Sequence, residues 1–167
     1  MAFALFISFV VLLRLAELYI AARNERRMRL QGAVEYGSAH YPVIVCLHTF
    51  FFVSLLVEYC LFGPHSYHTG LIALYLLLVL LKAWVISSLG RFWNTRILRI
   101  PGTPLVANGP YRFVKHPNYI IVVAELIIIP MTFDLYRTAI VFSLLNAAML
   151  YVRIGVENRA LKDGRPE

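Results

Sequence analysis

The chain has 167 residues, of which 60% are hydrophobic and 15% are charged, and its formal net charge is +7. Several apolar runs reach the roughly 20 residues that cross a bilayer, which excludes an ordinary soluble domain. We therefore expect one integral membrane domain over residues 1–167. Lys and Arg gather in alternate loops and no basic run is interleaved with aromatics, so the charge does not indicate nucleic-acid binding.

Five apolar segments predict transmembrane helices and hence an all-α fold. They cover residues 2–22, 41–62, 69–89, 119–133 and 136–156. The fourth segment is short for a span, which usually needs roughly 17–25 residues, and Pro130 lies near its end. We expect it to form a tight hairpin with the fifth segment. The three helices within residues 1–89 would precede a cytosolic segment, this hairpin and a tail within residues 90–167.

The distribution of Lys and Arg predicts the orientation of the chain in the membrane. Basic residues follow the first, third and fifth helices, whereas the two opposite loops hold only Arg137. The positive-inside rule then places the N-terminus outside, and residues 90–118 and the C-terminus in the cytosol.

Ionisable side chains lie inside the predicted spans, where each would cost about 2.5–3.5 kcal/mol at the helix centre if unpaired. Arg14 and Glu17 are three residues apart and can pair on one helical face, which favours a structural role. Glu125 either faces an interior cavity or pairs with Lys82, and the sequence leaves both alternatives open. Glu58 lies in the second span.

No metal site is expected. Cys46 and Cys60 have no C-x-x-C partner, and we interpret them as small packing residues. His65 and His68, in "PHSYH", have no carboxylate or cysteine nearby, so that ligand set would be incomplete.

Residues 90–118 form a long connection with three glycines and four prolines. Long structured loops in small domains are usually functional, and this spacing excludes one regular helix. The stretch "RIPGTPLVANGPY" predicts successive turns around the apolar residues 105–107, forming a flap or wall at the membrane surface.

The stretch "KHPNY" predicts a helix start with Pro117 at the first position and His116 near the N-cap. Free backbone N–H groups there, together with Lys115, suit an anion such as a carboxylate. The alternative is an interfacial belt of Lys and Tyr. In "RIGVENRAL", Arg153 and Glu157 share a helical face on the same side of the membrane, and a plain ion pair is the alternative there.

Together, "LVANGPYRFVKHPNY" and "RIGVEN" resemble the isoprenylcysteine carboxyl methyltransferase family. The family pattern is Leu-Val-x-x-Gly-x-Tyr, then Arg-His-Pro-x-Tyr-x-Gly, then Arg-x-x-x-Glu-Glu on the last helix. The resemblance covers about residues 91–161. This chain has Lys115 for the motif Arg, Ile121 for the Gly and Asn158 for the second Glu. These departures bear on the acceptor more than on the chemistry, because Lys lacks the bidentate fork of Arg.

The resemblance implies an S-adenosylmethionine site without a Rossmann fold, roofed by residues 90–118, with the lipophilic acceptor entering from the bilayer. The helix start at residues 116–119 would receive the cofactor's carboxylate, and Glu157 its ribose hydroxyls or ammonium. The predicted cofactor-binding residues are Leu105, Val106, Gly109, Pro110, Tyr111, His116, Pro117, Tyr119 and Glu157.

Methyl transfer requires alignment of the acceptor and exclusion of water. Arg153 or Lys115 would orient a carboxylate acceptor, and Asn94 in "FWNTR" is a further acceptor contact. A hydroxyl acceptor would need a base, for which His116 or Glu157 are candidates. The implied function is O-methylation of an isoprenylcysteine-type carboxylate or of a hydroxyl or enol on a long-chain metabolite such as an alkylpyrone.

The alternative is a non-enzymatic membrane protein, such as a transporter subunit or an assembly partner. That alternative does not explain the long Gly/Pro-rich segment. Expected partners are the lipophilic substrate and membrane lipids, and the sequence leaves the oligomeric state open.

Overall fold

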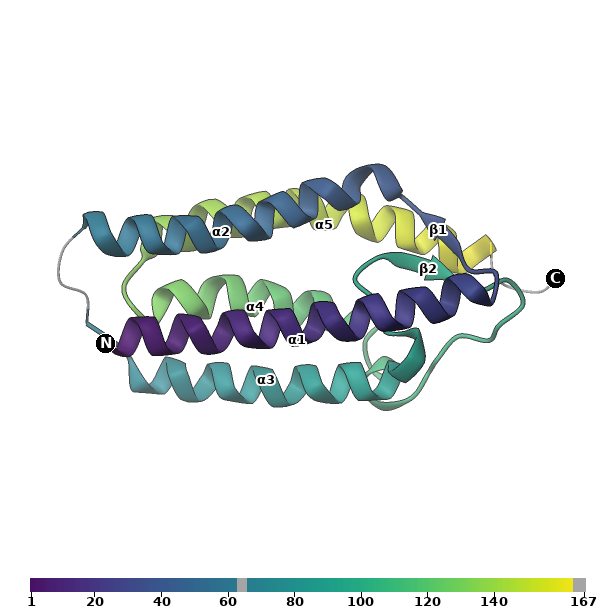
Figure 1. Ribbon diagram of the computed structural model, residues 1–167, viewed down its shortest axis with the longest axis horizontal. Helices are drawn as coiled ribbons and strands as arrows, with labels where there is room; N and C mark the ends of the chain where they lie inside the picture. The colour runs from purple at the N-terminus through teal and green to yellow at the C-terminus, as the bar shows by residue number, and fades with distance from the viewer. Residues whose placement is uncertain (63–65, 164–167) are drawn as a thin grey trace.

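The computed structural model describes residues 1–62 and 66–163, so His65 lies outside the described residues. Five α-helices run along the long axis of the molecule (Figure 1). They are α1 (Ala2–Leu30), α2 (Tyr41–Leu61), α3 (Thr69–Leu89), α4 (Pro117–Met131) and α5 (Tyr136–Asp163). The predicted all-α fold without a Rossmann domain is confirmed.

Four of these helices are long and apolar enough to cross a membrane: α1, α2, α3 and α5. The protein is therefore an integral membrane protein. Helix α4 has 15 residues and is about 22 Å long, shorter than the roughly 30 Å of a bilayer core. As the sequence predicted, it is the short member of a hairpin with α5.

Helices α1 and α5 continue beyond the ends predicted from hydrophobicity. Helix α1 continues through "RNERRMRL" to Leu30, and α5 continues to Asp163. Arg, Glu and Met are good helix formers, and Glu25 pairs with Arg29 one turn later at 2.7 Å. Hydropathy shows where the membrane ends, whereas these polar residues prolong the helix into water.

Helix α4 lies at the centre of the bundle and packs against α3 and α5 (Figure 1). Leu126 and Ile129 are almost fully buried there. The turn into α5 includes Asp134, whose φ is 57°. Glu58 of α2 accepts hydrogen bonds from the backbone N–H groups of Arg137 (3.1 Å) and Thr138 (2.7 Å). It thereby satisfies donors that the start of α5 would otherwise leave unpaired in the membrane.

Four ionisable residues of the spans form one ionic cluster, in which Lys82 and Glu125 are buried and Arg14 and Glu17 are partly buried. Arg14 donates to Glu17 at 2.9 Å, which confirms the predicted pair, and to Glu125 at 2.5 Å. Lys82 donates to the two oxygens of Glu125 at 3.0 and 2.8 Å and lies 3.1 Å from Glu17. Glu125 thus pairs with Lys82, and two cations balance two carboxylates.

A small polar structure joins the helices at the end of the molecule where the basic residues gather. Strand β1 (Val34–Tyr36) pairs antiparallel with β2 (Ile97–Arg99). Short 3-10 turns flank the strands: η1 (Ser38–His40), η2 (Gly90–Phe92) and η3 (Gly109–Arg112). The sequence did not predict these strands, because three residues are too few to show a period.

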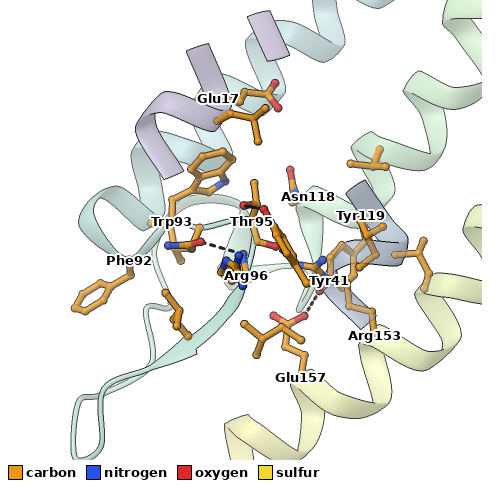
Figure 2. A pocket seen from close by; sticks show the side chains of 18 of the residues that line it. Glu17, Tyr41, Phe92, Trp93, Thr95, Arg96, Asn118, Tyr119, Arg153 and Glu157 are labelled. Carbon is orange, nitrogen blue, oxygen red and sulfur yellow. Dashed lines mark hydrogen bonds between the residues drawn. The ribbon is translucent and has the colours of Figure 1, made fainter. Parts of the chain in front are cut away.

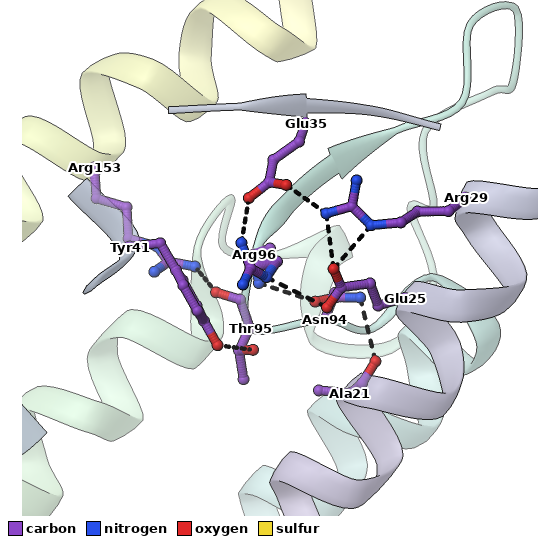
Figure 3. A network of polar contacts seen from close by, with 9 residues as sticks. All are labelled: Ala21, Glu25, Arg29, Glu35, Tyr41, Asn94, Thr95, Arg96 and Arg153. Atoms are coloured by element: carbon purple, nitrogen blue, oxygen red, sulfur yellow. Dashed lines mark hydrogen bonds and ion pairs between the residues drawn. The ribbon is translucent and has the colours of Figure 1, made fainter. Parts of the chain in front are cut away.

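Glu35 of β1 is the centre of a network at this end (Figure 3). It accepts hydrogen bonds from Arg29 of α1 and from Arg96 at 2.6 Å. The Arg96 guanidinium lies 4.0 Å from the centre of the Tyr41 ring. The network therefore ties the end of α1 and the start of α2 to the segment after α3.

The packing role predicted for Cys46 and Cys60 is wrong. Both are free thiols whose side chains are exposed on α2. His68 pairs with Asp134 at 2.9 Å.

Candidate active site

One cavity of about 900 Å³ extends from the basic end of the molecule into the membrane bundle (Figure 2). Faces of α1, α2, α4 and α5 line it, together with the segment that follows α3. Helix α5 has 28 residues and α4 has 15, so α5 is about 20 Å longer. The last turns of α5 extend past the start of α4 and form a wall of the cavity.

The cavity has a polar end and an apolar end. Its polar wall includes Tyr41, Asn94, Thr95, Arg96, Lys115, Asn118, Tyr119, Arg153 and Glu157. Its apolar wall lies between the membrane helices and includes Val11, Leu15, Ile44, Phe52, Val122 and Leu150. A molecule with a polar head and an apolar body matches this division.

Tyr119, Arg153 and Glu157 form the centre of the polar end. The Tyr119 hydroxyl donates to Glu157, and the Nε of Arg153 donates to the same hydroxyl at 2.9 Å. The Arg153 guanidinium also lies 5.6 Å from the centre of the Tyr119 ring. The sequence predicted Arg153 and Glu157 on one face, and the structure places Tyr119 between them (Figure 2).

His116 adjoins this centre. Its Nδ1 lies 3.3 Å from Glu157 Oε2, and its ring stacks on the Tyr119 ring at 5.2 Å. Its Nε2 is buried and has no hydrogen-bond partner among the described residues. His116 is the N-cap of α4 and Pro117 is its first residue, as predicted. The sequence predicted that this helix start binds a carboxylate of the cofactor. The carboxylate of Glu157 already lies beside it.

Two residues that the sequence analysis missed hold Arg153 in place. An Arg153 Nη2 donates to the backbone oxygen of Thr95 at 2.5 Å. The Thr95 hydroxyl in turn lies 3.1 Å from the Tyr41 hydroxyl. Figure 3 shows this chain of contacts continuing through Arg96 to the Glu35 network. The only sequence signal for Tyr41 was its place at the basic end of a predicted helix.

Lys115 lies on the exposed rim of the cavity, where it donates to the side-chain oxygen of Asn158 at 2.5 Å. These two residues are two of the three departures from the family pattern. A neutral amide beside a lysine thus stands where the family pattern has a carboxylate and an arginine.

The Gly/Pro-rich segment contributes only part of the predicted wall. Leu105, Val106 and Tyr111 line the cavity, whereas Gly109, Pro110, His116 and Pro117 are not among its lining residues.

Gly109 allows η3 to approach α3. Its φ is 57°, and a Cβ there would lie 2.1 Å from the Ser88 hydroxyl oxygen. Tyr111 packs against the core, and burial, with a contribution from Glu157, raises its pKa to about 12. This phenol therefore stays protonated at neutral pH.

Asn94 lines the cavity, but its amide already has partners. Its oxygen accepts from the backbone N–H of Arg96 at 2.9 Å, and its nitrogen donates to the Ala21 oxygen at 3.4 Å. These bonds fix the turn before β2, and the predicted contact with the acceptor stays a prediction. Asn118 was also missed, and its buried side-chain oxygen has no partner among the described residues.

The chain matches one family model and two bacterial proteins. The family model of the isoprenylcysteine carboxyl methyltransferase family matches residues 71–163. Over 163 residues the chain is 42% identical to an uncharacterized protein of Bacillus subtilis (strain 168), YpbQ, covering 96% of this chain and 97% of that protein.

The chain is also 25% identical, over 155 residues, to an uncharacterized protein of Haemophilus influenzae, covering 91% of this chain and 90% of that protein. No solved structure matches the chain. The matched region contains α4, the end of α5 and most of the cavity's polar wall. The chain belongs to the isoprenylcysteine carboxyl methyltransferase family.

Proposed function

We propose that the protein is a membrane-embedded, S-adenosylmethionine-dependent O-methyltransferase that acts on a lipophilic acceptor. The observation that carries this proposal is a continuous cavity, whose polar end holds Tyr119, Arg153 and Glu157 and whose other end is an apolar space inside the bundle. A water-soluble cofactor and a lipid can meet only in a site that opens to both phases.

The donors and acceptors of the polar end fit the cofactor. S-adenosylmethionine supplies a methyl group on a sulfonium, which is a good leaving group. Glu157 and the unpaired oxygen of Asn118 suit its ammonium and ribose hydroxyls. Leu105 and Val106 offer an apolar wall for its base. The ammonium of Lys115 at the rim suits the cofactor's carboxylate.

The acceptor would enter between α1 and α2. Leu15 and Leu18 of α1, with Val53 and Leu56 of α2, line the cavity and are also exposed on the outer surface. Side chains that face both the cavity and the lipid mark the edges of a lateral opening. An acceptor tail can cross this opening without leaving an apolar environment.

Arg153 would orient the reacting group of a carboxylate acceptor. Its hydrogen bonds to Thr95 and Tyr119 use two of five N–H donors, so others remain for the acceptor. A carboxylate acceptor needs no base. A hydroxyl acceptor must lose its proton as it takes the methyl group, and His116 or Glu157 would accept that proton. The proposal includes both acceptor classes.

Cofactor binding provides the first test. We expect S-adenosylhomocysteine to bind the purified protein in a calorimeter, and Glu157→Gln to weaken binding at least tenfold, because a neutral amide oxygen accepts weaker hydrogen bonds than a carboxylate from the ligand's ammonium and hydroxyl groups. Asp134→Asn, at the opposite end of the bundle, is the control and should bind like the parent. No binding by the parent would refute the proposal.

Transfer of labelled methyl groups identifies the acceptor. The parent would be incubated with methyl-labelled cofactor and either a lipid extract, a prenylcysteine analogue or a long-chain alkylpyrone. Base-labile label on the prenylcysteine indicates a carboxylate acceptor, whereas base-stable label in the extract or on the pyrone indicates a hydroxyl or enol. Cofactor binding without transfer to any of the three would support a non-enzymatic role.

A further inference from the structure

A second group of polar side chains lines the cavity, deeper in the membrane than the polar end. Arg14, Glu17, His48 and Asn146 belong to the cavity wall, although apolar residues surround them on each helix. They come from α1, α2 and α5, so they are far apart in the sequence. An apolar tail alone gives no reason for polar groups at this depth, where each is costly.

Helix geometry places these groups at one depth. On each of three helices the polar residue lies seven positions, or about 10 Å, from a residue at the polar end of the site. The three pairs are Arg14 with Ala21, His48 with Tyr41, and Asn146 with Arg153. Ala21, Tyr41 and Arg153 are joined to the segment of Asn94 and Thr95 by hydrogen bonds, so they share the layer of the active site.

Two members of this deep layer have unused hydrogen-bonding capacity. The Asn146 side chain is 4% exposed, and no hydrogen bond to it is present among the described residues. His48 uses one ring nitrogen in a 2.9 Å contact with the Ile44 oxygen, which leaves the other nitrogen for a partner. Arg14 and Glu17, in contrast, are already paired within the ionic cluster.

A buried amide in a membrane bundle without a partner is unfavourable, because burying it without a hydrogen bond costs more than exposing it to water. The neighbouring cluster is neutral, so the layer as a whole does not select a charged ligand. The unused groups, an amide and an imidazole nitrogen, suit a neutral oxygen that both donates and accepts, such as a hydroxyl.

We propose that the acceptor is a lipid with two polar positions: the group that is methylated at Arg153, and a hydroxyl about 10 Å along its chain that binds Asn146 and His48. This inference rests on the proposed function and specifies its substrate class. A plain chain would bind more weakly, because such a chain leaves both deep groups unpaired.

Chain-position isomers test the inference by equilibrium binding. The full-length protein in detergent, saturated with S-adenosylhomocysteine, would be titrated with hexadecanoic acid and with its 3-hydroxy and 9-hydroxy derivatives. The 9-hydroxyl lies about 10 Å from the carboxylate in an extended chain, the depth that two helical turns set. Alkylpyrones with the same three chain patterns form a second series.

We expect the mid-chain hydroxyl to strengthen binding about tenfold over the plain chain in at least one series, as one well-formed hydrogen bond does. Asn146→Leu should abolish this preference. Met149→Leu, which alters a lining residue of the same helix without removing a polar group, should preserve it. The isomer comparison on the parent decides the question if Asn146→Leu does not fold.

Equal binding of all isomers in both series, or no binding of any, overturns the inference. A preference that persists in folded Asn146→Leu also overturns it. Cofactor binding without positional preference contradicts this inference alone. Positional preference in the absence of S-adenosylhomocysteine binding contradicts the proposed methyltransferase function alone.

Discussion

Lys115 and Asn158 contact each other across the rim of the cavity. The family pattern has Arg and Glu at these positions, and a pair of opposite charges there would be neutral overall. A lysine beside an amide keeps one net positive charge at the rim. The two departures are therefore one physical change, which leaves the ammonium of Lys115 free to attract an anion.

Arg153 and Lys115 differ in how firmly they are held, and this difference predicts unequal effects of exchanging Lys and Arg. Arg153 donates from two nitrogens to fixed partners, a geometry that a lysine cannot reproduce. We expect Arg153→Lys to lower kcat/KM about 100-fold, or about 2.7 kcal/mol of transition-state stabilisation. Lys115→Arg, on the exposed rim, should change it less than threefold.

Methyl transfer measured over a range of acceptor concentrations checks this prediction. Thermal unfolding of both variants serves as the control for folding, and S-adenosylhomocysteine affinity separates cofactor binding from acceptor binding. Equal effects of the two exchanges would contradict the assignment of Arg153 as the orienting group.

The sequence predicted those site residues that belong to a motif and also share one face of a helix or lie at its start. Arg153 and Glu157 are four apart, and His116 and Tyr119 flank a proline that starts a helix. Thr95 escaped prediction because it contributes a backbone oxygen, which any residue could supply. Tyr41 lies 112 positions from Arg153 (153 minus 41), so only the folded chain brings it to the site.

At the scale of elements, the helices followed from hydropathy, whereas the β1–β2 ribbon did not. Its two strands are three residues each and come from either side of α2 and α3. No local pattern encodes such a pairing. Charged side chains hold it instead, because Glu35 joins the ribbon to Arg29 on α1 and to Arg96 beside Tyr41.

The charge on Glu35 makes the stability of this end depend on pH. Burial disfavours the carboxylate, but hydrogen bonds from Arg29 and Arg96 outweigh it and lower the pKa of Glu35. A carboxyl whose pKa is lowered by folding stabilises the fold above its unfolded pKa of about 4.3, and the benefit is lost as pH falls through the folded value.

We therefore expect Glu35→Gln to lower the thermal midpoint by a constant amount between pH 6 and pH 8, approximately the range in which both states of the parent carry the charge. The difference between parent and variant should shrink below about pH 4.3, because the parent then loses the same charge. Thermal scans in detergent at several pH values measure it. A difference that stays constant down to pH 3 would contradict the role of the charge.

At the scale of the whole molecule, the buried ionic cluster joins three helices. Arg14 and Glu17 are on α1, Lys82 on α3 and Glu125 on α4. Removing one partner from such a cluster leaves an uncompensated charge, which costs about 3–5 kcal/mol. Removing one cation and one carboxylate together leaves the Arg14–Glu17 pair and a neutral core.

Glu125→Leu should accordingly destabilise the protein strongly, and Lys82→Met in the same chain should recover at least half of the loss. Unfolding by denaturing detergent, followed by circular dichroism, provides the measurement. The two single variants complete the double-mutant cycle. If the double variant is as unstable as the sum of the single variants, the two residues are not coupled, and the contact of Lys82 with Glu125 contributes nothing.

The orientation of the molecule decides whether the proposed cofactor site meets the cytosol. The polar end of the cavity, the β ribbon and the ends of α1 and α5 lie together, and this end carries most of the basic residues. The opposite end carries Arg137, whose guanidinium lies 3.7 Å from the centre of the Phe62 ring. Positive charge resists translocation, so the polar end should remain in the cytosol.

Reporter fusions to the C-terminus test this orientation. A green fluorescent protein fused after Glu167 should fluoresce, and alkaline phosphatase at the same position should be inactive, because the tail stays in the cytosol. Fusion of each reporter after Phe62, between α2 and α3, should give the opposite result. An active phosphatase at the C-terminus would place the cavity's polar end outside, away from the cytosolic pool of S-adenosylmethionine, and would contradict both the orientation and the proposed use of that cofactor.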